Sequence, residues 1–246
     1  MISYEDFFHA LCGTNTGMSD HYFKDQLYPL QDAVLGWMGS VETSFYLTGG
    51  TCLSRFLLHH RYSDDLDFFT NQHPLFLKEV DRLMDSITGK NLDINLVTKQ
   101  DSFVRCVVTR GDVNLKVEFI NDVKYRVGNP IKDSTGINLD TWQNILSNKI
   151  TALGRQAPKD FVDILFLSFK FQFNWEKMID HAKEKDASVN EIDVSKMLSD
   201  FDLSQLSNVI FPSDLSIGLI TAENFKILAR ESLHGFDNSL YGLFNR

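Results

Sequence analysis

The stretch from Tyr46 to Phe69 constrains this chain most, because it combines a glycine turn with closely spaced carboxylates. It reads YLTGGTCLSRFLLHHRYSDDLDFF. Its apolar runs, glycines and helix-start residues predict a strand over 44–48, a turn at Gly49 and Gly50, a helix over 51–60 and a second strand over 66–69. A strand, a tight turn, a helix and an acidic strand are therefore expected in immediate succession.

The glycine turn allows a ligand to approach the backbone closely. Gly49 and Gly50 carry no side chain, and the first turn of the following helix offers unpaired N–H groups that favour an anion. A phosphate group suits such a place. A plain tight turn, with Thr51 as the helix cap, also explains these residues.

The acidic strand brings two carboxylates to one side. Residues two apart on a strand point the same way, so Asp65 and Asp67 project together while Leu66 and Phe68 enter the core. Such a pair repels unless a cation is shared, and carboxylate oxygens suit Mg²⁺ or Mn²⁺. Asp64 is expected to face away.

A third carboxylate is expected from the strand predicted over 113–120. Its apolar residues alternate with polar ones, which turns Glu118 away from the face that its neighbours bury. If this strand lies beside the Asp65 strand, Glu118 completes the set that two metal ions need. The alternative is an exposed charge on a half-solvated strand.

The remaining pattern predicts an α+β chain. Strands are expected over 92–98, 103–109 and 113–120, with a hairpin loop at Arg110, Gly111 and Asp112. Helices are expected over 4–11, 20–38, 75–87, 142–154, 159–171, 175–185, 189–199 and 222–233. The switch near residue 130 predicts a mixed-sheet domain over 1–130 and an all-helical domain over 131–246.

Composition excludes several other classes of protein. The 246 residues, 43% of them hydrophobic, suffice for real apolar cores. No apolar run approaches the roughly 20 residues that span a bilayer, and the N-terminus carries acids where a secretory signal carries bases, so a cytoplasmic protein is expected. The net charge of −9 argues against coating nucleic acid through overall charge, although a local basic face remains open.

The first stretch resembles the DNA polymerase β-like nucleotidyltransferase superfamily, and within it the AbiEii/AbiGii toxin family, which is MenT-like. A second stretch, KITALGR followed by PKDFVD over 149–163, is similar to that family's Lys, Ala-Leu, Arg and Arg-Asp-x-x-Asp signature. Lys159 stands where Arg is common, which keeps the charge but loses bidentate geometry. The resemblance covers roughly 45–167.

This resemblance implies transfer of a nucleoside monophosphate from an NTP to an acceptor, with release of pyrophosphate. It assigns Asp65, Asp67 and Glu118 to the metal and to catalysis, with Glu118 helping to activate the attacking hydroxyl. It also implies catalytic roles for Lys149, which would neutralise phosphate charge, and for Asp160. The nucleotide contacts that it implies are Gly49, Gly50, Thr51, Arg61, Ser63, Lys149 and Arg155.

Several of these residues have simpler explanations. Arg61 and Arg155 can equally form ion pairs with nearby acids. Asp160 and Asp163 lie in the first turn of a helix, where acids stabilise the helix dipole. His59 and His60 could approach the nucleotide, but exposed helix-end residues are the expectation.

The resemblance also implies a biological setting. The acceptor is expected to be RNA, such as the 3′ end of tRNA, and the protein the toxin of a type IV-like toxin–antitoxin pair with a cognate antitoxin. Two alternatives stay open: an inactive nucleotide-binding interaction protein, and a nucleotidyltransferase that modifies small molecules of the antibiotic type.

Overall fold

The chain divides into two compact units. The structure is a computed structural model that describes residues 20–87, 92–215 and 217–244, so the helix expected over 4–11 lies outside the described residues. Among these described residues, the sheet unit comprises 23–57 and 63–145, and the helical unit comprises 20–22, 58–62 and 146–244. The domain boundary expected near residue 130 stays a prediction. The compact units group 131–145 with the sheet, because a short hairpin there pairs with it.

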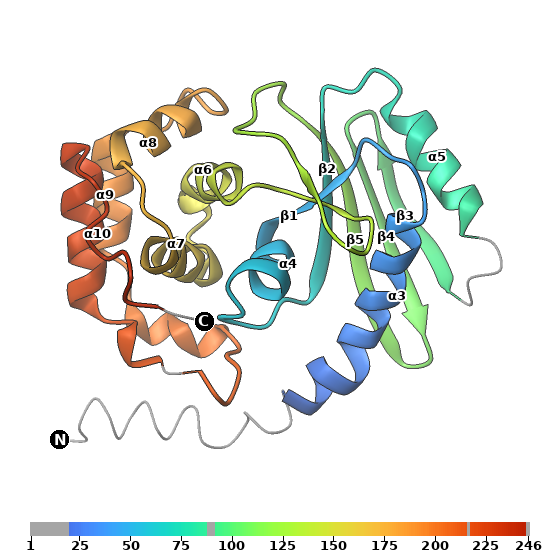
Figure 1. Cartoon of the computed structure of the whole chain (residues 1–246), viewed down its shortest axis with the longest axis horizontal. Helices are drawn as coiled ribbons and strands as arrows, with labels where there is room; N and C mark the ends of the chain where they lie inside the picture. The colour runs from blue at the N-terminus through green and yellow to red at the C-terminus, as the bar shows by residue number, and fades with distance from the viewer. Residues whose placement is uncertain (1–19, 88–91, 216, 245–246) are drawn as a thin grey trace. The chain divides into compact units, whose positions relative to one another are not determined.

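The sheet unit is built on a mixed seven-stranded sheet flanked by helices (Figure 1). Its order is β3-β4-β5-β2-β1-β7-β6. The strands are β1 (Tyr46–Thr48), β2 (Asp65–Asn71), β3 (Asp93–Gln100), β4 (Phe103–Arg110), β5 (Val113–Asp122), β6 (Ile131–Lys132) and β7 (Asn138–Leu139). The β2–β5 and β1–β7 pairs are parallel and the others antiparallel.

Alternation along the strands gives the sheet one apolar, fully buried face and one polar face. Residues such as Leu66, Val117 and Phe119 are fully buried, as period-two alternation predicts. Helices α3 (Tyr28–Gly39) and α5 (Phe76–Ser86) lie together, since the indole of the first's Trp37 donates to the second's Ser86 hydroxyl. Phe45 packs edge-to-face on both Phe76 and Phe119, which joins α5 to this buried face.

The helix after the glycine turn is shorter than expected and starts earlier. It runs as α4 (Gly49–Cys52) and continues as the π-helical segment η2 (Leu53–Leu57). The predicted helix over 51–60 was wrong at its end, because residues 58–60 are not helical. They begin the short segment that belongs to the helical unit.

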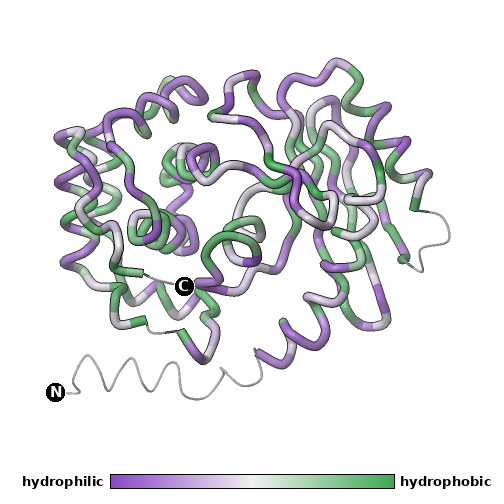
Figure 2. Tube along the Cα trace, viewed as in Figure 1, coloured by the Kyte–Doolittle hydropathy of each residue, from purple (hydrophilic) through white to green (hydrophobic). Residues whose placement is uncertain are grey.

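The helical unit is built around a buried helix, α7 (Pro158–Lys170), whose course is coloured mainly as hydrophobic in Figure 2. The other helices are α6 (Trp142–Ala152), which begins in the sheet unit, η3 (Leu153–Arg155), α8 (Trp175–Lys183), α9 (Glu191–Ser199), η4 (Leu203–Asn208), η5 (Ile217–Leu219) and α10 (Ala222–His234). Side chains of Asn174, Asn190 and Thr221 cap the N-termini of α8, α9 and α10. Within the described residues, no helix has the length and apolar character that crossing a membrane requires.

Candidate active site

Gly49 brings the backbone against an acidic side chain. Its φ of +69° lies in the left-handed region, and a Cβ built on it would lie 2.7 Å from Oδ2 of Asp67. The close approach follows from the pairing of β1 with β2, which sets Thr48 opposite Asp67. Only glycine therefore fits this position without strain or a clash.

Asp65 and Asp67 project from the same face of β2, as period-two alternation predicts. Thr51 supports them from α4, because its buried hydroxyl donates to the carbonyl oxygen of Asp65. Thr51 is thus not the helix cap that the plain-turn interpretation proposed. The helix begins at Gly49, two residues earlier.

Glu118 lies beside this pair. Strand β5 runs parallel to β2 with Asp67 opposite Glu118 and Asp65 opposite Lys116. On the other side of Glu118, the antiparallel β4 sets Arg105 opposite it. The condition set for Glu118, that its strand lies beside the acidic strand, is met, and its role as a third carboxylate stays a prediction.

Two basic side chains contact these carboxylates. The Lys116 ammonium lies 3.0 Å from Oδ2 of Asp65 and 3.6 Å from Oε1 of Glu118. The Arg105 guanidinium donates to the same Oε1 at 2.7 Å from its Nε. A chain of alternating charges therefore runs across three strands on the polar face of the sheet.

The donor set of this face fits a divalent ion through Asp65 and Asp67. Two aligned carboxylates supply the hard oxygen ligands that Mg²⁺ accepts together with phosphate oxygens. Among residues 20–87, 92–215 and 217–244, no three His, Cys, Asp or Glu side chains are grouped as a metal site would require. The third predicted carboxylate, Glu118, has its Oε1 bound by Arg105 and Lys116.

The second signature forms a buried ion-pair cluster within the helical unit. At its centre is Asp163 of α7, which has no exposed surface. Arg61 donates to its two oxygens, from Nε at 2.6 Å and from Nη2 at 2.8 Å, and Nε2 of His60 lies 2.8 Å from Oδ1. The Lys149 ammonium lies 2.7 Å from Oδ2.

Asp160 binds the same lysine from one helical turn earlier. Its Oδ1 accepts from Nζ of Lys149 at 2.7 Å, and its Oδ2 accepts from Nη2 of Arg155 at 2.8 Å. Asp160 is fully buried and the Lys149 side chain is 8% exposed, whereas the Arg155 side chain is 66% exposed. Arg155 is thus the member of the cluster that reaches solvent.

Burial and charge together set the protonation of this cluster. Burial raises the pKa of Asp163, but Arg61 and Lys149 outweigh it and hold that pKa well below its ordinary value. Burial lowers the pKa of Lys149, but Asp163 and Asp160 raise it above its ordinary value. Burial also lowers the pKa of His60, more than its hydrogen bond to Asp163 raises it.

The remaining predicted positions differ in exposure. Asp64 is exposed, as expected. His59 is exposed, but the expectation for His60 was wrong, because that ring is fully buried between Asp163 and Phe166. The ion-pair explanation for Arg61 and Arg155 is confirmed by their partners in α7. Ser63 is buried, and its carbonyl accepts from the amide of Gln31.

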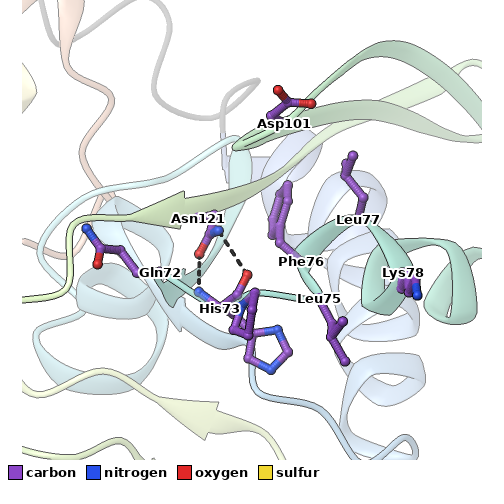
Figure 3. Close-up of a pocket in the computed structure, with 9 residues that line it drawn as sticks. Gln72, His73, Leu75, Phe76, Leu77, Lys78, Asp101 and Asn121 are labelled. Atoms are coloured by element: carbon purple, nitrogen blue, oxygen red, sulfur yellow. Dashed lines mark hydrogen bonds between the residues drawn. The ribbon is translucent and has the colours of Figure 1, made fainter.

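Each unit also contains a cavity. One of about 480 Å³ opens at the far end of β2, where the Asn121 side chain bonds both the backbone N–H and the carbonyl of His73 (Figure 3). Leu75 and Phe76 give it an apolar wall. The other, also about 480 Å³, lies between the α6–η3 turn at Gly154 and helix α9.

The fold of the chain is similar to that of solved structures. Two crystal structures from Helicobacter pylori share the fold. One is a candidate nucleotidyltransferase, with a TM-score of 0.55 and 19% identity over 84% of this chain and 93% of that one. The other is JHP933, with a TM-score of 0.53 and 20% identity over 85% and 90%. They define the fold class as a mixed sheet flanked by helices.

The family follows from the sequence match. The model of the nucleotidyl transferase AbiEii toxin family, of the type IV toxin–antitoxin system, matches residues 38–235, and the chain belongs to this nucleotidyltransferase family. The resemblance identified from the two signatures is thereby confirmed. No curated protein matches the chain.

Sequence reasoning missed Lys116 and Arg105. The signal for Lys116 was present, because it is two residues before Glu118 and shares its strand face. Arg105 could have been found from the hairpin, where β4 and β5 are joined by Gly111 and Asp112 alone. The expected three-residue loop shifts the register by one, which turns Arg105 away from Glu118.

Proposed function

We propose that this protein transfers a nucleoside monophosphate from an NTP to an acceptor hydroxyl. The acceptor oxygen attacks the α-phosphorus, the bond from that phosphorus to the bridging oxygen breaks, pyrophosphate leaves with the bonding electrons, and the hydroxyl proton is released. The observation that supports this most is the pair Asp65 and Asp67 on one face of β2, beside the glycine turn.

In this proposal the sheet unit binds the triphosphate. Asp65 and Asp67 would hold Mg²⁺ or Mn²⁺, which when bound offsets the phosphate charge and polarises the reacting phosphoryl group. The backbone at Gly49 and Gly50 admits the β and γ phosphates, because no side chain stands there. Thr51 holds the glycine turn against β2 through its hydrogen bond to the Asp65 carbonyl oxygen. Glu118 helps to activate the acceptor hydroxyl.

The helical unit supplies positive charge. We assign its helices to the all-α domain of this fold, with Lys149 and Arg155 as phosphate contacts and Asp160 as the carboxylate that orients both. The 66% exposure of Arg155 supports its role. Arg61 is 3% exposed, which favours a supporting role through Asp163 over direct nucleotide contact. Ser63 remains a proposed contact at the start of the acidic strand.

The acceptor and the partner follow from the family. We propose that the acceptor is RNA, with the 3′ end of tRNA as the first candidate, and that the protein is a cytoplasmic toxin controlled by a cognate antitoxin. The description of the family as a type IV toxin–antitoxin toxin supports this setting. Transfer to small hydroxylated molecules is the competing outcome, and both acceptors belong in the same assay.

The test is label transfer with matched variants. Wild-type protein, Asp67→Asn and the exposed neighbour Asp64→Asn are incubated with Mg²⁺, each labelled NTP, and either total tRNA or a panel of hydroxylated small molecules. We expect label on tRNA with wild type and Asp64→Asn, and at least about a hundredfold loss with Asp67→Asn, since metal-held charge supplies several kcal/mol to such a reaction.

Three outcomes would contradict this proposal. No transfer from any of the four nucleotides by folded protein would count against catalysis. Equal nucleotide affinity of wild type and Asp67→Asn in Mg²⁺ would favour a binding protein without metal chemistry. Label on small molecules alone would exclude RNA as the acceptor.

A further inference from the structure

The Lys116 ammonium occupies a position inside the carboxylate set. It lies 3.0 Å from Asp65 of the neighbouring strand β2 and 3.6 Å from Glu118 of its own strand β5. The side chain is 42% exposed, so solvent and ligands can reach it. A cation already bridges two of the three carboxylates of the polar face.

The charges of this face are close to balanced before any metal binds. Asp65, Asp67 and Glu118 carry three negative charges when ionised, and Lys116 and Arg105 return two positive ones. Two positive charges are what one divalent ion contributes. In sites with two metal ions, both ions offset the charge of three carboxylates and a triphosphate. One divalent ion together with these two side chains supplies the same total.

The arrangement also limits where a metal ion can bind. A second ion bridging Asp65 and Glu118 would have to displace the Lys116 ammonium and compete with Arg105, whose Nε lies 2.7 Å from Oε1 of Glu118. Asp67 stands opposite Glu118 in the register of β2 and β5, with its Oδ2 close to Gly49. A single ion at Asp65 and Asp67 shares only Asp65 with Lys116 and leaves the bonds of Glu118 to Arg105 and Lys116 in place.

We propose that Lys116 takes the place of a second metal ion, so that the protein works with one divalent ion held by Asp65 and Asp67. This inference rests on the proposed function. Glu118 then acts as the anchor that holds Lys116 and Arg105 in position. Lys116 is accordingly a positioning residue that sets the metal stoichiometry of the site.

The test counts bound metal ions directly. Full-length protein saturated with a non-hydrolysable NTP analogue is titrated with Mn²⁺, and bound ions per chain are counted by electron paramagnetic resonance, which also detects coupling between adjacent Mn²⁺ ions. The variants are Lys116→Met, Lys116→Arg and the control Lys99→Met, whose lysine lies on β3 and pairs with Asp81 instead. Counting every ion on the analogue-loaded chain, including the one that the analogue shares with Asp65 and Asp67, we expect one ion for wild type, Lys116→Arg and Lys99→Met.

The Lys116→Met variant is expected to bind two ions with a coupled signal, because loss of the ammonium opens the position between Asp65 and Glu118. Two ions in wild type, or one ion in both wild type and Lys116→Met, would overturn the inference. Label transfer to tRNA, measured on the same preparations, separates these results from failure of the proposed function. Wild type that binds the analogue but no Mn²⁺ would overturn both the inference and the proposed metal dependence.

Discussion

At Gly49 the backbone and a carboxylate meet without room for a side chain. Gly49→Ala places a methyl group 2.7 Å from Oδ2 of Asp67 at a φ of +69°. We expect a loss of about 1–3 kcal/mol in the free energy of unfolding, from backbone strain, together with loss of transfer activity as Asp67 is displaced. Urea denaturation and the label-transfer assay measure the two effects.

The matched control is Gly36→Ala. Gly36 lies inside α3, and a Cβ there has no neighbour within 4 Å. Alanine should leave stability unchanged or raise it by up to about 1 kcal/mol, because glycine is the poorer helix former. Equal destabilisation by the two variants would refute the close-approach argument.

The buried ring of His60 gives the helical unit a pH dependence. Its pKa is lowered in the folded state, so the unfolded chain binds a proton more readily. The stability that it contributes is complete above its ordinary pKa of about 6.5 and is lost as pH falls from there through the folded pKa. We expect the melting temperature of wild type to fall between pH 7.5 and 5.5 more steeply than that of His60→Gln.

The neighbouring histidine provides the comparison. His59 is exposed with a φ of 54°, a conformation that asparagine tolerates, so His59→Asn should keep the wild-type slope. If His60→Gln and wild type show the same slope, the slope has its origin in other groups.

At the scale of elements, alternation and turn signals predicted most of the sheet but not its register. The strands expected over 103–109 and 113–120 match β4 and β5 closely. A one-residue error in their loop hid the pairing of Arg105 with Glu118, because one step reverses the face of every side chain. The prediction that Asp65 and Asp67 share one face of β2 was unaffected by this error, because spacing within one strand does not depend on the register with its neighbour.

The helical cluster could not be predicted in the same way. Arg61 and Asp163 are 102 residues apart, and no local pattern reports such a contact. The helix expected over 51–60 made the histidines exposed end residues, whereas the helix ends at Leu57 and the chain then carries His60 into the core. Helix ends are where propensity yields to tertiary packing.

The start of α6 is tied to the glycine turn through Asp140. Its buried carboxylate accepts from the Thr48 hydroxyl at 2.6 Å and from Arg126 at 2.9 Å. Asp140→Ala leaves that arginine without its ion-pair partner, so we expect a loss of about 3 kcal/mol or more in chemical denaturation. Asp133→Ala, which removes a carboxylate from an exposed turn, should cost only about 1 kcal/mol. Similar losses for both would argue against the buried link.

For the whole molecule, the net charge of −9 limits how RNA can be held. A chain with 24 Lys and Arg residues and 33 Asp and Glu residues can offer few contacts to phosphates. We expect the affinity for labelled tRNA to fall only shallowly with salt, with a log–log slope below about 3 in magnitude. Fluorescence anisotropy between about 50 and 200 mM salt measures it. A slope steeper than about 5 would reveal an extended basic face.

The helical unit is discontinuous in sequence, because residues 58–62 lie within the stretch that supplies the sheet unit. Those five residues deliver His60 and Arg61 to Asp163. A gene fragment beginning at residue 146 would therefore encode α7 without His60 and Arg61, two of the residues that contact its buried Asp163. Neither unit can therefore be exchanged between proteins as one continuous segment of sequence. Recombination that preserves both would have to carry the acidic strand and the helices together.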